Sequence, residues 1–314
     1  MGLIAQATAF SIALVSAGCG IAKPSYPYLE VSSEDLRATV RFLTGIQPPR
    51  NHANVESMDK AADYIKRKMA DYGIVPEEQV FQAQGKRYVN VIGTLGASQG
   101  PRVIVGAHYD VCGEGPGADD NASAVAGLLE IARLAKTHES ELPYRVDFVA
   151  FALEEPPFFR TEQMGSYVHA KSLRDGKVEV KGMICLEMIG FFSEVEKSQK
   201  YPLGILRLFY PRVGNFVAVV GNLGSSSLVR NVARHMRAAR MDVRTLKAPR
   251  FIPSVGLSDH WSFWKHGYDA VMITDTSFYR NPNYHRATDT METLDFEKMG
   301  KVVKGVCWTV LNMK

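Results

Sequence analysis

β-Branched, strand-like runs alternate with segments of helical periodicity, and this alternation constrains the fold of the chain more than any other feature. The expected helices are residues 32–45, 56–72, 121–136, 163–173, 226–240 and 296–311. The expected strands are residues 87–92, 103–107, 144–153, 183–186, 216–220, 242–246 and 269–274. Such alternation indicates a mostly parallel sheet with helices on both faces. The sequence therefore predicts an α/β fold, a three-layer α/β/α sandwich around a mostly parallel, mixed sheet.

The first 22 residues read as a signal segment rather than as part of the fold. They carry no charged side chain, and the apolar run 7–17 suits the core of a signal peptide. Val15-Ser16-Ala17 fits a cleavage site, whereas Ser16-Ala17-Gly18-Cys19 resembles a bacterial lipobox in which Cys19 is lipidated. We expect an exported protein, in the periplasm, at the outer surface or anchored to the membrane. A frayed or buried N-terminal helix is the alternative.

Composition removes several classes of protein from consideration. The 37 Lys and Arg residues exceed the 33 Asp and Glu residues by four, but no run of five basic residues suggests a nucleic-acid partner. A mean hydropathy of −0.11 excludes a polytopic membrane protein. Three cysteines remain outside the signal segment, without paired spacing, so we expect small buried side chains and no disulfide framework: Cys112, Cys185 and Cys307. No repeat or linker divides residues 23–314, which we expect to form one domain.

Side chains of metal-binding type cluster just after the expected strands. In chain order they are His108 and Asp110, Asp119 and Asp120, Glu154 and Glu155, Glu187, and His285. In open α/β sheets, ligands bind outside the carboxyl ends of the strands. We therefore expect these side chains to meet at one edge of the sheet.

Each of these clusters also has a simpler structural explanation. His108 and Asp110 suit a hydrogen-bonded pair, and residues 119–121 suit a helix N-cap with acids in the first turn. Glu154 and Glu155 suit an exposed loop, but they directly follow an apolar run, where buried carboxylates are unfavourable unless a cation compensates them. The coincidence of all the clusters at one edge favours a metal site.

Imidazole and carboxylate ligands without cysteine point to zinc first, and then to manganese or cobalt. The set of two histidines and several carboxylates is large enough for two metals that share a bridging carboxylate, as in two-metal hydrolases. One catalytic zinc with three protein ligands is the alternative.

The ordered motifs resemble the co-catalytic zinc exopeptidases of the bacterial leucyl aminopeptidase type, a clan that also contains glutamate carboxypeptidases and glutaminyl cyclases. The resemblance covers residues 55–312 and rests on five motifs: His108-Tyr109-Asp110, Gly117-Ala118-Asp119-Asp120-Asn121-Ala122-Ser123, Glu154-Glu155, Glu187 and His285. It implies a zinc exopeptidase catalytic domain over residues 23–314, with a peptide as substrate.

The resemblance also implies which residues bind the metals. By position, His108 and Glu187 hold one zinc, Glu155 and His285 hold the other, and Asp119 bridges the two. Many members of the family have Asp where this chain has Glu187, so the longer side chain must place its carboxylate differently. Two zinc ions per chain are expected, although glutaminyl cyclases keep much of this ligand set and work with one.

The same resemblance assigns the catalytic roles. Asp110 is expected to orient His108, and the peptide bond between Asp119 and Asp120 is expected to be cis. Glu154 is expected to be the general base, which takes a proton from the attacking water and returns it to the leaving amine. The implied activity is an aminopeptidase that acts through a metal-bridging hydroxide.

Three alternatives to the aminopeptidase stay open at this point. The first is a glutaminyl cyclase-like acyltransferase, which would work with one zinc. The second is a carboxypeptidase or dipeptidase, which would keep the same motifs. The third is a non-catalytic binding ectodomain on the same fold, although such relatives lose metal ligands that this chain keeps.

A few further residues have roles that the sequence leaves undecided. Asp259 and His260 line the pocket or support it, and Asp289 caps the last helix or orients His285. The Gly-, Pro- and aromatic-rich residues 190–214 form an excursion or a lid.

Overall fold

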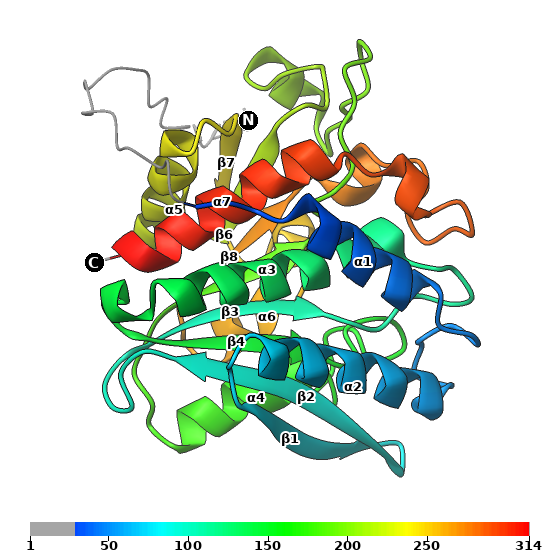
Figure 1. Cartoon of the computed structure of the whole chain (residues 1–314). Coiled ribbons are helices and arrows are strands. Elements are labelled where there is room, and N and C mark those ends of the chain that lie inside the picture. Colours follow the sequence, from blue (N-terminus) through cyan, green and yellow to red (C-terminus); the bar gives the residue numbers. More distant parts are fainter. Residues whose placement is uncertain (1–28, 314) are drawn as a thin grey trace, which may run out of the picture.

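The structure of the chain is a computed structural model that describes residues 29–313, arranged as one sheet between two layers of helices (Figure 1). The signal segment predicted at residues 1–22 lies outside the described residues. Among the helices of residues 29–313, none combines the length and the apolarity needed to cross a membrane.

Eight strands build the sheet in the order β1-β2-β4-β3-β5-β8-β6-β7. Their bounds are β1 Pro76–Ala83, β2 Lys86–Leu95, β3 Arg102–His108, β4 Arg145–Phe151, β5 Val180–Glu187, β6 Val217–Asn222, β7 Val243–Ala248 and β8 Ala270–Thr274. The four central strands β4, β3, β5 and β8 are parallel, whereas β1, β2 and β6 each pair antiparallel with a neighbour. The sheet is therefore mixed, with a parallel centre.

Helices cover both faces of the sheet. Their bounds are α1 Ser33–Thr44, α2 Val55–Asp71, α3 Ala124–Thr137, α4 Gly165–Asp175, α5 Ser226–Ala238, α6 His260–Lys265 and α7 Phe296–Asn312. Figure 1 shows α1, α2, α3 and α7 together across one face. Helices α4 and α6 pack on the other face.

Side-chain alternation along the strands divides the buried residues into two cores. In β3, Val103 and Val105 belong to the core beneath α3 and α7, whereas Ile104 belongs to the core beneath α4 and α6. This alternation follows from the two-residue period of a strand. Both faces of the central strands are buried, which explains their nearly continuous apolar sequence.

The predicted three-layer α/β fold is confirmed, and the differences concern weakly patterned elements. Strand β1 was not predicted because PEEQVFQA is mostly polar, as suits an exposed edge strand. Helix α6 was not predicted because six residues are too short to show helical periodicity. Helix α3 begins at Ala124, after an irregular turn (η1) at Ala118–Ser123 that sequence analysis had taken as the start of the helix.

The parallel centre of the sheet positions the chemistry. Strands β3, β4, β5 and β8 run in one direction, so their carboxyl ends meet at one edge. His108 is the last residue of β3 and Glu187 is the last residue of β5.

Gly106 tests how tightly this centre is packed, because a Cβ there would collide with the buried ring of Phe151. We expect Gly106→Ala to lower the free energy of unfolding by about 1–3 kcal/mol, the usual cost of overpacking. Gly204→Ala is the matched control, because a Cβ there meets no atom within 4 Å. Urea denaturation followed by circular dichroism measures both variants, and equal stability would contradict the packing described.

Candidate metal centre

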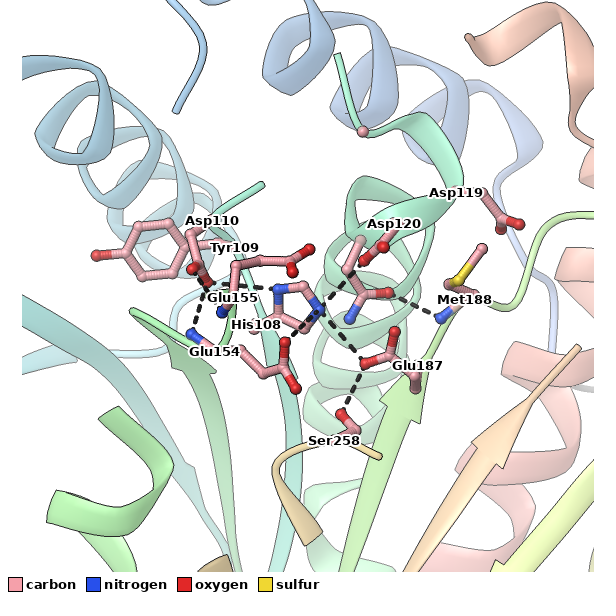
Figure 2. Close-up of polar contacts among 12 residues, drawn as sticks. His108, Tyr109, Asp110, Asp119, Asp120, Glu154, Glu155, Glu187, Met188 and Ser258 are labelled. Carbon is pink, nitrogen blue, oxygen red and sulfur yellow. Dashed lines mark hydrogen bonds and ion pairs between the residues drawn. The ribbon is translucent and has the colours of Figure 1, made fainter. Parts of the chain in front are cut away.

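Six side chains converge at the carboxyl edge of the sheet, and five of them are labelled in Figure 2. They are His108 and Glu187 at the ends of β3 and β5, Glu154 and Glu155 just after β4, Asp120 in the turn before α3, and His285 in the loop after β8. All but His285 are buried, and His285 is 27% exposed. The predicted convergence of these clusters is what the structure shows.

His108 faces three carboxylates through a single nitrogen. Its Nε2 lies 3.3 Å from Glu187 Oε2, 3.4 Å from Asp120 Oδ1 and 3.8 Å from Glu154 Oε2. On the other side of the site, His285 Nε2 lies 3.2 Å from Asp120 Oδ2 and 3.3 Å from Glu155 Oε2. The two oxygens of Asp120 therefore face two different imidazoles, which is the position of a bridging carboxylate.

The prediction that Asp119 bridges the site is wrong, because its carboxylate points away from both histidines. Its Oδ1 accepts a hydrogen bond from the Gly190 amide at 2.9 Å, and its Oδ2 accepts one from Asn281 Nδ2 at 2.7 Å. Figure 2 shows Asp119 apart from the cluster around His108. The cis peptide bond is also one residue later than predicted, between Asp120 and Asn121. Two consecutive acids in an irregular turn cannot share one direction, and the motif alone did not say which of them faces the site.

The donor atoms of the site fit a metal ion. Among the described residues, buried atoms without a hydrogen-bond partner include both ring nitrogens of His108, Asp120 Oδ1 and Glu155 Oε1. Two atoms each bound at about 2.0–2.2 Å to a tetrahedral zinc lie about 3.3–3.6 Å apart. The imidazole–carboxylate distances of 3.2–3.4 Å within each set are close to that spacing. His108, Glu187 and Asp120 could hold one ion, and His285, Glu155 and Asp120 a second.

Negative charge is in excess around these ligands. Nine buried carboxylates lie in and next to the site: Asp110, Asp119, Asp120, Glu154, Glu155, Glu187, Asp259, Asp275 and Asp289. Burial raises the pKa of Glu154 well above its ordinary value and raises that of Glu155 to about 8. Clustered carboxylates of this kind need cations, and bound metal ions would supply them.

The buried carboxylates also raise the pKa of both histidines of the site. Burial lowers the pKa of His108, but the charges of Glu187 and Glu154 outweigh burial and bring that pKa well above its ordinary value. For His285, hydrogen bonds to Asp120 and Glu155 likewise outweigh burial and raise the pKa to about 10. Without a metal, the carboxylates thus draw protons onto the imidazoles.

Asp110 holds the two glutamates in place through their backbone. Its two oxygens accept hydrogen bonds from the amides of Glu154 and Glu155, at 3.1 Å and 3.0 Å. Its Oδ1 lies 3.4 Å from His108 Nδ1. Asp110 thus contacts the imidazole of His108, which it was expected to orient, at a longer distance. Its shorter hydrogen bonds are those from the backbone amides of Glu154 and Glu155.

Asp289 and Arg50 hold the loop that carries Asp120. Asp289 accepts hydrogen bonds from the amides of Asp119 and Asp120, at 3.0 Å and 3.1 Å, so it fixes the turn rather than capping the last helix. The buried guanidinium of Arg50 donates to four carbonyls, among them Gly117 O at 2.7 Å. Sequence analysis missed Arg50, because a lone arginine far from the motifs carries no signal.

Ser258 shows how the longer side chain of Glu187 is held at a position where the resemblance leads one to expect Asp. Ser258 Oγ donates to Glu187 Oε2 at 2.6 Å and so anchors the longer side chain against the imidazole of His108. The neighbouring Asp259 is fully buried, and burial raises its pKa to about 7. His260 Nε2 pairs with Val255 O at 2.7 Å, so this ring supports the loop.

Cys112 differs from the other two cysteines. Cys185 and Cys307 are buried, as expected, but Cys112 is half-buried. Its thiol sulfur and one ligand atom each of Glu155 and His285 lie within 4.8 Å of one another. Sequence analysis did not connect Cys112 with the site, because its spacing matches no metal motif.

Comparisons with known proteins give a family and several relatives. The sequence profile of peptidase family M28 matches residues 90–310. YfbL, an uncharacterized protein of Escherichia coli, is 42% identical over 93% of this chain and 92% of its own length. A probable zinc metalloprotease of Phaeosphaeria nodorum is 28% identical over 71% of this chain; the chain spans 52% of that relative.

Solved structures share the fold. The LapA aminopeptidase of Legionella pneumophila superimposes with a TM-score of 0.71 at 20% identity, over 89% of this chain and 71% of LapA. Glutaminyl cyclase of Bacteroides thetaiotaomicron superimposes with a TM-score of 0.68 at 18% identity, over 91% of this chain and 99% of the cyclase. At these identities the likeness shows the three-layer architecture alone.

Substitution of Asp119 and Asp120 in turn tests which carboxylate lies between the two proposed ligand sets. We expect Asp120→Asn to lose most of its bound divalent metal, because the amide cannot offer two anionic oxygens to the two ligand sets. Asp119→Asn, the matched control, should keep its metal, because the Asp119 carboxylate contacts Gly190, Asn281, Ser123 and Asp275, none of which belongs to the two ligand sets. Elemental analysis after dialysis measures both, and metal loss confined to Asp119→Asn would overturn the assignment.

Ser258→Ala should weaken metal binding, because it frees the carboxylate of Glu187. The expected loss is about 10- to 100-fold in affinity, the usual effect of removing a residue that orients a ligand. Ser262→Ala is the control, because this buried serine pairs with Ser166 at 2.9 Å. Competition with a chromogenic chelator measures the affinities, and an unchanged value for Ser258→Ala would remove its anchoring role.

Proposed function

Given that this chain is a metallopeptidase of peptidase family M28, we propose that it is a zinc-dependent aminopeptidase, which removes N-terminal residues from peptides. The observation that carries the proposal is the position of Asp120 between the imidazoles of His108 and His285. Two three-residue ligand sets that share one carboxylate suit two metal ions, the arrangement of co-catalytic hydrolases. A one-metal cyclase would leave one of the two sets without an ion.

Zinc is the proposed metal because both sets combine imidazole and carboxylate, and because one relative is named a probable zinc metalloprotease. When bound, the ions would polarise the scissile carbonyl and lower the pKa of water. The protein contributes the geometry: His108, Glu187 and Asp120 on one side, and His285, Glu155 and Asp120 on the other.

Glu154 is the proposed proton carrier. Its carboxylate lies 3.8 Å from His108 Nε2, farther than those of Asp120 and Glu187, so it borders the ligand set without completing it. Burial raises its pKa, which favours uptake of a proton from water and its later transfer to the leaving amine. Asp110 holds the Glu154 amide and thereby keeps the carboxylate at the site.

The charge of the site favours a free N-terminus over a free C-terminus. A protonated or metal-facing amine is stabilised by the surrounding carboxylates, whereas a C-terminal carboxylate would be repelled by them. Lys200 and Arg244 are the basic residues, other than His285, that line the cavity beside the site.

We also propose that residues 1–22 direct export of the protein and that Cys19 carries a lipid anchor.

Glu154→Gln should separate chemistry from binding. We expect this variant to keep its fold and its metal and to lose about 10²- to 10⁴-fold in turnover, the usual contribution of a positioned acid–base group. The readout is mass spectrometry of a peptide pool that contains free, acetylated and Gln-started N-termini, with and without a chelator. Wild-type protein should shorten only the free N-termini, and only without the chelator.

Glu196→Gln, at an exposed glutamate, is the control variant and should behave as wild type. Full activity of Glu154→Gln would remove the proposed base. Loss of ammonia from Gln-started peptides, with no shortening, would replace the aminopeptidase by a cyclase.

A further inference from the structure

A long cavity leaves the metal centre and crosses the sheet toward β7. Four residues of one register row line its floor: Glu187 on β5 pairs with Thr274 on β8, Thr274 pairs with Ala218 on β6, and Ala218 pairs with Arg244 on β7. Three inter-strand steps of about 4.8 Å make this row about 14 Å long. The row begins at a metal ligand and ends at Arg244, whose side chain is 41% exposed. The cavity therefore runs from the reacting centre to the surface.

The floor and the walls of this cavity are mostly apolar. The apolar lining residues include Ala218, Val220, Leu246 and Met272 from the strands, and Phe159, Leu206, Phe216, Leu257 and Phe278 from the loops and short 3-10 turns between them. Tyr201 and Tyr210 of the excursion 190–214 also line the cavity. Their hydroxyls already donate to Pro211 O at 2.6 Å and to Thr245 O at 2.8 Å. The two tyrosine rings therefore present apolar surface to the cavity, and their hydroxyls are already hydrogen-bonded within the protein.

Key polar side chains midway along the cavity are also engaged within the protein. Gln199 accepts from Arg280 Nε at 2.9 Å and donates to Thr276 Oγ1 at 2.9 Å. Thr274 Oγ1 accepts from the Thr276 amide at 2.9 Å. A polar ligand group placed beside Gln199 and Thr274 would lose water and find these side chains already paired, which is unfavourable. An apolar group would gain from burial over the apolar part of the lining, as far as Arg244 at the outer end.

We propose that this cavity binds the N-terminal side of the substrate and selects a long apolar group, a linear alkyl chain of about eight carbons. A leucine side chain would fill only the first part of a row about 14 Å long. The inference rests on the proposed aminopeptidase function and adds its substrate class: amides whose acyl side carries a lipid-like chain.

Ala218 sets the usable length of the cavity. It is the smallest residue of the register row and lies two strand steps from the proposed metal ligand Glu187 and one step from the exposed Arg244. A larger side chain at this position would divide the cavity while leaving the metal centre and Thr274 in place. Ala218 is thus a specificity-determining residue and not part of the catalytic machinery.

The test uses 4-nitroanilides of alanine, norleucine, 2-aminooctanoic acid and 2-aminodecanoic acid. For the wild-type chain, we expect kcat/KM to rise about fourfold for each added methylene (~0.8 kcal/mol) up to 2-aminodecanoate. In Ala218→Leu, the rise with chain length should end before 2-aminodecanoic acid. Ala248→Leu is the matched control, on the same face of β7 but outside the cavity lining, and should keep the full rise.

Two kinetic results would overturn the proposal. One is a wild-type optimum at norleucine with slower cleavage of both longer substrates. The other is the same dependence on chain length in Ala218→Leu as in wild type.

A binding measurement separates this inference from the proposed function. Calorimetry of chelator-treated protein with nonylamine, compared with propylamine, needs no catalysis and presents no carboxylate to the acidic site. Tight binding of the longer amine that Ala218→Leu weakens at least tenfold would support the cavity even if no anilide is cleaved, and only the aminopeptidase proposal would then fail. Equal affinity for the two amines would overturn the inference even in an active enzyme.

Discussion

Burial of many carboxylates at one edge of a sheet is the constraint on which the rest of this structure depends. Ionised carboxylates are costly to bury without cations or hydrogen bonds. Here the carboxylates of Asp120, Glu155 and Glu187 face imidazoles. Those of Asp110 and Asp289 accept hydrogen bonds from backbone amides. The acids therefore divide into those that face the proposed metals and those that hold the loops presenting them.

The parallel centre of the sheet makes this arrangement possible. Parallel strands bring their carboxyl ends to one edge. The ends of β3 and β5, which are distant in sequence, therefore place His108 Nε2 3.3 Å from Glu187 Oε2. The loops that supply the other ligands are fixed by buried groups rather than by secondary structure. Arg50 holds the loop before Asp120 through carbonyls, and Ser258 holds Glu187.

The same sheet separates chemistry from recognition. The proposed ligands lie at its edge, whereas the cavity lies over β8, β6 and β7, on the same face of the sheet as α4 and α6 but outside these two helices. Arg280 joins the two regions, because its guanidinium binds Gln199 of the excursion and lies 4.6 Å from the centre of the Phe216 ring. The excursion therefore acts as a wall of the cavity that is tied to the loop carrying His285.

The sequence by itself determined the layered fold and the clusters that meet at one edge, because strand and helix periods and strand-end positions are local properties of the chain. It could not choose between Asp119 and Asp120, because the direction of each side chain depends on Gly190, Asn281 and Asp289, which are distant in sequence. It also could not show the cavity, whose floor forms only when β5, β8, β6 and β7 pair in register. Tertiary contacts decided these features because the hydrogen bonds and packing that fix them join residues far apart in the chain.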